Sequence, residues 1–71
     1  MTTINMRLYE VKRRIDNSQF EIISETRLLN NLGTKIVTAH GHVVVAYDSG
    51  KAVIQGKNPK QMERVLTRED I

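Results

Sequence analysis

Two histidines are the residues best placed to do metal chemistry. His40 and His42 flank Gly41, and neutral imidazole nitrogens are common metal ligands. A zinc site, however, needs three or four protein ligands. The chain has no cysteine, and no third ligand stands at a recognisable spacing from this pair. We therefore expect no metal site, and we interpret the two histidines as residues that flank a glycine turn.

Nucleophilic and acid–base chemistry also lack a pattern in the sequence. Each of three serines, Ser18, Ser24 and Ser49, stands at a predicted turn or helix start, and none can be assigned the base and acid that a nucleophilic triad requires. The carboxylates are scattered. The four glycines match neither a phosphate-binding loop nor a dinucleotide fingerprint. We expect a protein that is not an enzyme, uses no cofactor or small-molecule substrate, and acts by binding.

The basic side chains are concentrated in the later part of the chain. Residues 1–25 carry four basic and four acidic side chains, which cancel. Residues 26–68 carry seven basic side chains against two acidic ones, a local balance of +5. A basic surface of this kind attracts polyanions. Lysines on small domains are often merely solvated, so charge alone does not separate these two interpretations.

Residues 34–66 contain the clearest secondary-structure signals. Three short runs rich in β-branched residues, at 35–39, 43–47 and 51–55, predict strands. Residues 48–50, Asp-Ser-Gly, have the composition of a tight hairpin turn. Asn58 and Pro59 are a favourable helix start, with apolar residues spaced for one helical face after them. We predict a three-stranded antiparallel meander followed by a helix, a β-β-β-α unit.

The first half of the chain is ambiguous between a helix and a hairpin. Leu8, Val11 and Ile15 match one face of a helix, but alternate residues from Tyr9 to Ile15 also match a strand. Because residues 16–18, Asp-Asn-Ser, favour a turn, we predict two strands ending at Ile23 and keep a helix as the alternative for residues 6–15. Ser24 then predicts the start of a second helix.

That second predicted helix would direct Leu28, Leu29 and Leu32 inward and end at Gly33. With 71 residues, of which 39% are hydrophobic, the chain is expected to form one domain, 1–71, around one core. The predicted fold class is α+β: an antiparallel sheet of about five strands with two helices packed on one face. No signal-type or membrane-spanning apolar run is evident, so we expect a cytoplasmic location.

Val44 to Leu66, VVAYDSGKAVIQGKNPKQMERVL, resembles the N-terminal TATA-binding-protein-like domain of bacterial ribonuclease HIII. The matching elements are Ala-Tyr at the end of one strand, Ser-Gly-Lys in the turn, Gln-Gly-Lys at the end of the next strand, and the following helix. The resemblance covers about a third of the chain. It implies a module with helices on one sheet face and an RNA/DNA hybrid on the other, without the nuclease domain that follows it in that family.

Strand alternation sorts the residues of this region into two faces. Val44, Ala46, Ala52 and Ile54 would pack under the helices, and their neighbours would form the opposite face. On that opposite face the resemblance implies phosphate contacts from Lys51 and nearby Lys57, polar contacts from Gln55 and base stacking by Tyr47. The nucleic-acid-binding set predicted in this way is Lys35, Tyr47, Ser49, Lys51, Gln55 and Lys57.

The same face carries enough valine to suit a protein partner. Val43, Val45 and Val53 beside Tyr47 would form an apolar strip rimmed by lysines, as in a protein interface. The alternative function is therefore a small protein-binding modulator, such as a phage-type inhibitor that docks on a host enzyme. A homo-oligomer that buries this face against itself is a third possibility.

Overall fold

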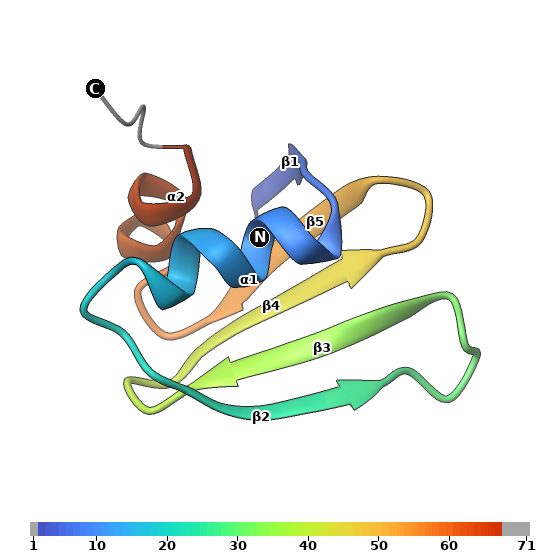
Figure 1. Cartoon of the computed structure of the whole chain (residues 1–71), viewed down its shortest axis with the longest axis horizontal. Coiled ribbons are helices and arrows are strands. Elements are labelled where there is room, and N and C mark those ends of the chain that lie inside the picture. Colours follow the sequence, from blue (N-terminus) through green and yellow to red (C-terminus); the bar gives the residue numbers. More distant parts are fainter. Residues whose placement is uncertain (1, 68–71) are drawn as a thin grey trace.

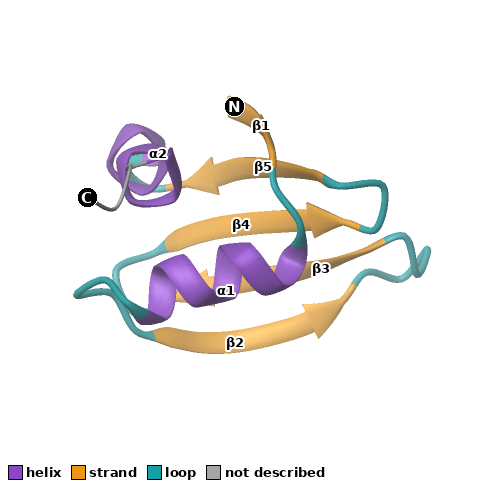
Figure 2. Cartoon of the chain, turned by 45° about the horizontal axis from the view of Figure 1, so that its top comes forward, coloured by secondary structure: helices purple, strands orange, loops and turns teal. Residues whose placement is uncertain are grey.

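The chain folds as a five-stranded antiparallel sheet with two helices on one of its faces (Figure 1). The computed structural model describes residues 2–67. In chain order the elements are β1 (Thr2–Asn5), α1 (Leu8–Asp16), β2 (Ile22–Arg27), β3 (Gly33–Thr38), β4 (His42–Tyr47), β5 (Lys51–Gly56) and α2 (Pro59–Thr67). The strand order across the sheet is β1-β5-β4-β3-β2. The first two strands thus lie at opposite edges, and they are connected through α1, which lies over the middle of the sheet (Figure 2).

The predicted α+β class and the predicted β-β-β-α unit are confirmed. Strands β3, β4 and β5 form the expected antiparallel meander, because their β-branched residues suit an extended, half-buried backbone. In the turn between β4 and β5, Gly50 has a φ of +99° and its amide donates to the Tyr47 carbonyl at 3.0 Å. Helix α2 begins at Pro59, where the missing amide proton leaves no helical hydrogen bond unmade.

The hairpin predicted across residues 9–23 is wrong, and α1 occupies most of it. Val11 and Ile15, one helical turn apart, are both fully buried, so the helical spacing and not the alternation decides the conformation. The Ser18 hydroxyl donates to the Ile15 carbonyl at 2.6 Å and accepts from the Phe20 amide at 3.1 Å. Residues 16–18 therefore end a helix instead of joining two strands.

The helix predicted from Ser24 to Gly33 is also wrong. Residues 22–27 form the edge strand β2, which pairs with β3 through a register shift between Ile22 and Ser24. The leucines expected to face inward lie in the following loop, where Leu29 is fully exposed and Leu32 is 60% exposed. The short strand β1, which no sequence signal predicted, pairs with β5 at the other edge.

One hydrophobic core lies between the helices and the covered face of the sheet. The four residues predicted to pack under the helices, Val44, Ala46, Ala52 and Ile54, are at most 1% exposed. The core residues are Val11, Ile15, Phe20, Ile36, Val44, Ala46, Ala52, Ile54, Met62 and Leu66. Because both helices contribute to this one core, the opposite face of the sheet is left without a helical cover. In the part of the chain that the structure describes, no helix is long and apolar enough to cross a membrane.

Candidate nucleic-acid interface

The uncovered side of the sheet, here called the open face, is defined by strand register. Lys35 lies opposite Val45, Val45 lies opposite Val53 and Val43 opposite Gln55, and successive residues of a strand alternate between faces. The open face consists of Thr3, Asn5, Ser24, Thr26, Lys35, Val37, Val43, Val45, Tyr47, Lys51, Val53 and Gln55. The register thus gives Tyr47, Lys51 and Gln55 the shared face that strand alternation predicts.

Tyr47 lies against a glycine on the neighbouring strand. Gly33 is its partner across β3 and β4, and a Cβ atom added at Gly33 would lie 3.2 Å from Tyr47 Cδ1. The same added atom would lie 2.8 Å from the Ala46 carbonyl oxygen. Glycine therefore makes room for the aromatic ring, which is half-buried and keeps only part of its surface for stacking.

The open face is cationic because its strand positions include lysines and no carboxylate. Within residues 2–67, the open-face positions defined above include Lys35 and Lys51, both exposed, and no aspartate or glutamate. The acidic residue of β2, Glu25, lies on the helix side, where its Oε1 is 3.0 Å from Lys12 Nζ. Among these strand positions, the charge of the lysines is therefore not offset by an acid.

The six residues predicted to bind nucleic acid do not form one cluster. Lys35, Tyr47, Lys51 and Gln55 share the open face, whereas Ser49 lies in the turn after β4. Lys57 follows β5 at the end opposite Lys51, roughly 20 Å away by the rise of a strand. Its side chain lies beside Gly41, where an added Cβ atom would be 3.2 Å from Lys57 Cδ. A ligand must therefore span the length of the sheet to contact both lysines.

The valines of the open face are only partly accessible. Val45 is only 6% exposed, and Val43 and Val53 are half-buried. Their neighbours in the sheet already cover much of their surface. The residues of the alternative interface therefore share one face, but they offer little apolar area to a partner.

The two histidines contact neighbouring side chains and rings in the way that structural residues do. His42 is fully buried; its Nδ1 lies 2.9 Å from Thr38 Oγ1 and its Nε2 lies 2.9 Å from Gln61 Oε1. These contacts occupy both ring nitrogens and connect the sheet to α2. The Phe20 ring meets the rings of His40 and His42 edge-on, at centroid distances of 4.9 and 4.7 Å. Among residues 2–67 no three potential metal ligands lie together.

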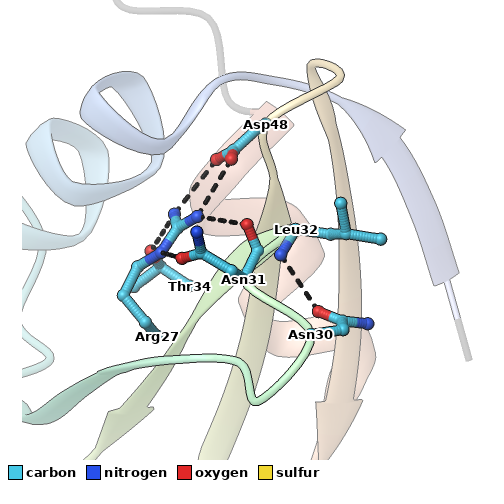
Figure 3. Close-up of polar contacts among 6 residues, drawn as sticks. All are labelled: Arg27, Asn30, Asn31, Leu32, Thr34 and Asp48. Atoms are coloured by element: carbon cyan, nitrogen blue, oxygen red, sulfur yellow. Dashed lines mark hydrogen bonds and ion pairs between the residues drawn. The ribbon is translucent and has the colours of Figure 1, made fainter.

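A polar network fixes the loop between β2 and β3 (Figure 3). The Arg27 guanidinium donates to the Asn31 carbonyl at 2.7 Å, to Asn31 Oδ1 at 3.2 Å and to Thr34 Oγ1 at 3.1 Å. It also binds the Asp48 carboxylate in the β4–β5 turn. Asn30 Oδ1 accepts from the Leu32 amide at 3.0 Å. The loop backbone is thereby held in place while the side chains of Leu29 and Leu32 remain exposed.

One basic residue beside the open face carries no signal in the sequence. Arg7 connects β1 to α1, and its guanidinium carbon lies 3.9 Å from the position of a Cβ atom added at Gly50. The pairing of Asn5 with Lys51 brings this N-terminal segment to the β4–β5 turn. Because β1 carried no strand signal, nothing in the sequence linked Arg7 to Lys51.

No family model matches the chain, and neither a curated protein nor a solved structure matches it significantly.

Proposed function

We propose that the chain binds nucleic acid, an RNA/DNA hybrid or another duplex, by contacting its backbone with the open face. The observation that supports this most is the charge of that face: Lys35 and Lys51 project from it, and none of its described strand positions is acidic. Neither lysine makes a side-chain hydrogen bond or ion pair within residues 2–67. Lysines of this kind bind phosphates and release counterions.

The other open-face residues suit a complex with little base preference. The exposed part of the Tyr47 ring offers a stacking surface to a base or sugar, and the Gln55 amide offers one donor group and one acceptor. Phosphate contacts position a duplex without reading its sequence. The resemblance of residues 44–66 to a hybrid-binding module supports an RNA/DNA hybrid as the first ligand to test, and the arrangement of both helices on one face agrees with it.

Salt dependence of binding to a labelled hybrid tests this proposal. Each phosphate neutralised contributes roughly 0.9 to the slope of log affinity against log salt on a B-form duplex. Replacing Lys35 and Lys51 with glutamine should make the salt dependence shallower, reducing the magnitude of that slope by roughly 1.8. The matched control replaces Lys60 and Arg64 of α2, which removes the same charge from the helix side. Equal slopes for the two double variants would contradict the proposed footprint.

Protein binding is the second candidate, and a different observation favours it. Leu29 is fully exposed and Leu32 is 60% exposed, on a loop whose backbone is held by Arg27 and Asn30. A preordered loop loses little conformational freedom on binding, and exposed leucines gain from burial. This modulator would dock through residues 29 and 32 and not through the valines of the open face.

A comparison of two variants separates the two candidates. In the protein-binding case, a host protein retained at high salt and after nuclease treatment should be lost when Leu29 and Leu32 are both replaced with serine. The lysine variant should retain it. If the serine variant instead loses hybrid binding while the captured proteins stay the same, the proposal that the chain binds a protein through Leu29 and Leu32 is wrong.

A further inference from the structure

A pocket lies between the β1–α1 junction and the β4–β5 turn. Its volume is about 610 Å³. It borders the open face, because Asn5 and Lys51 belong to both and are paired across β1 and β5. The lining residues are Asn5, Met6, Arg7, Tyr9, Glu10, Arg14, Ser49, Gly50 and Lys51.

The charge of this pocket is positive after its internal ion pairs are counted. Glu10 is its one acidic residue, and that carboxylate accepts hydrogen bonds from Arg13 and from Arg14, the latter at 2.8 Å. Arg7 and Lys51 remain, and neither side chain has a hydrogen bond or ion pair within residues 2–67. Two cations that have no ion-pair partner among the described residues therefore line one pocket.

The backbone of the turn leaves room beside these cations. Gly50 has no side chain, and a Cβ atom added there would meet only the Arg7 guanidinium, at 3.9 Å and 4.0 Å. Its amide already donates to Tyr47 and its carbonyl already accepts from Met6. A ligand would therefore be recognised by side chains of the pocket. These are the Arg7 guanidinium, the Lys51 ammonium, the Ser49 hydroxyl and the Asn5 amide.

We infer that this pocket binds a phosphoryl group, either as a free phosphate anion or as part of a nucleic-acid strand. A guanidinium binds two phosphoryl oxygens at once, and a lysine adds a point charge. A hydroxyl and an amide donate to the remaining oxygens. The nucleic-acid form of this inference rests on the proposed function, since Lys51 would contact a strand lying on the open face; the free-anion form stands without it.

Titration with inorganic phosphate, followed by amide NMR shifts, tests the pocket alone. Phosphate, compared with chloride at equal ionic strength, should shift the amides of Arg7, Ser49, Gly50 and Lys51. Arg7→Gln should weaken phosphate binding roughly tenfold, Arg7→Lys should have an intermediate effect, and Arg64→Gln on α2 should have none. The dispersed spectrum of each variant shows that it is folded. Shifts no larger than those with chloride, or equal binding by the Arg7→Gln and Arg64→Gln variants, would overturn the inference.

Binding of a labelled RNA/DNA hybrid then distinguishes the two sources of phosphate. Phosphate shifts together with weaker hybrid binding by Arg7→Gln, by about fivefold, support a strand phosphate in the pocket. Phosphate shifts without hybrid binding by any variant support a free anion and reject the proposed function. Hybrid binding without phosphate shifts rejects the pocket and leaves the proposed function standing.

Discussion

Arg27 and Asp48 form a two-point ion pair between residues 21 positions apart, with Nη1 3.1 Å from Oδ1 and Nη2 2.9 Å from Oδ2. The hydrogen bonds between them lower the pKa of the Asp48 carboxyl and raise that of the Arg27 guanidinium. The same guanidinium binds the backbone of Asn31. One side chain thus connects the β2–β3 loop, which carries the exposed leucines, to the β4–β5 turn, which borders the pocket lined by Arg7 and Lys51.

Replacing Arg27 with glutamine should loosen both segments without unfolding the sheet. The Asp48 amide donates to the Leu32 carbonyl at 2.9 Å, so its hydrogen exchange reports on the connection. We expect exchange to become roughly three- to fivefold faster, since exposed ion pairs contribute little. Arg64→Gln is the control. Unchanged exchange in the Arg27 variant would show that the backbone hydrogen bond holds these segments without the ion pair.

Stability in acid should depend on Glu10. Hydrogen bonds from Arg13 and Arg14 lower the pKa of Glu10 from 4.5 to about 2 in the folded protein. Between these values the unfolded chain binds a proton that the folded one does not, so the free energy of unfolding falls as the pH drops. This contribution is complete above pH 4.5 and is lost as the pH falls through about 2.

Urea denaturation at several pH values between 7 and 2 measures this contribution. The difference in stability between the wild type and Glu10→Gln should be largest near neutrality and should shrink toward pH 2. Glu63→Gln on α2 is the control, because Glu63 makes no ion pair within residues 2–67. A difference that stays constant with pH would mean that the glutamine variant loses packing and not charge.

The buried contacts of His42 should depend on the Thr38 hydroxyl. Thr38 Oγ1 accepts from the His42 amide at 3.2 Å and contacts Nδ1 of the same residue. Thr38→Val removes both contacts and leaves buried polar groups unpaired, which should lower the free energy of unfolding by about 1–3 kcal/mol. Thr38→Ser keeps the hydroxyl and should cost about 1 kcal/mol through the lost methyl group. Wild-type stability of the valine variant would contradict this role.

Two glycines with positive φ should respond differently to substitution by alanine. Gly50 has a φ of +99° but an open surrounding, whereas a Cβ atom on Gly56, at a φ of +80°, would lie 2.5 Å from the Gly41 carbonyl oxygen. Gly50→Ala should cost about 1–2 kcal/mol for the backbone conformation alone. Gly56→Ala should cost at least about 1 kcal/mol more because of the overlap. Equal denaturation midpoints for the two variants would contradict this distinction.

The predictable part of the fold is the part decided by neighbours in the sequence. The runs at 35–39, 43–47 and 51–55 and the turn at 48–50 carry their own strand and hairpin signals, and β3, β4 and β5 form where these signals predict. Alternation along β4 and β5 was then enough to assign Val44 to the core and Lys51 to the other side.

The remainder depends on contacts between distant residues. Val11 and Ile15 satisfy a helix and a strand equally well, and their burial against the sheet and α2 decides between the two. In the same way, β2 lacks a strand pattern because its last four residues, Ser-Glu-Thr-Arg, are all polar or charged. Its Glu25 and Arg27 form ion pairs with Lys12 of α1 and with Asp48 of the β4–β5 turn, and neither partner is close in the sequence. Arg7 was missed for a related reason: its position beside Gly50 exists only once β1 has paired with β5.

The pairing of β1 with β5 also has a consequence for the order of folding. Thr2 of β1 lies opposite Ile54 of β5. Because the two strands are far apart in the sequence, β1 is synthesised well before the strand with which it pairs. The meander of β3, β4 and β5 needs only short turns, whereas closing β1 onto β5 requires a long loop and comes at a greater entropic cost. We therefore expect the N-terminal strand to join the sheet last, which makes the cavity lined by Arg7 and Lys51 among the final parts of the molecule to be assembled.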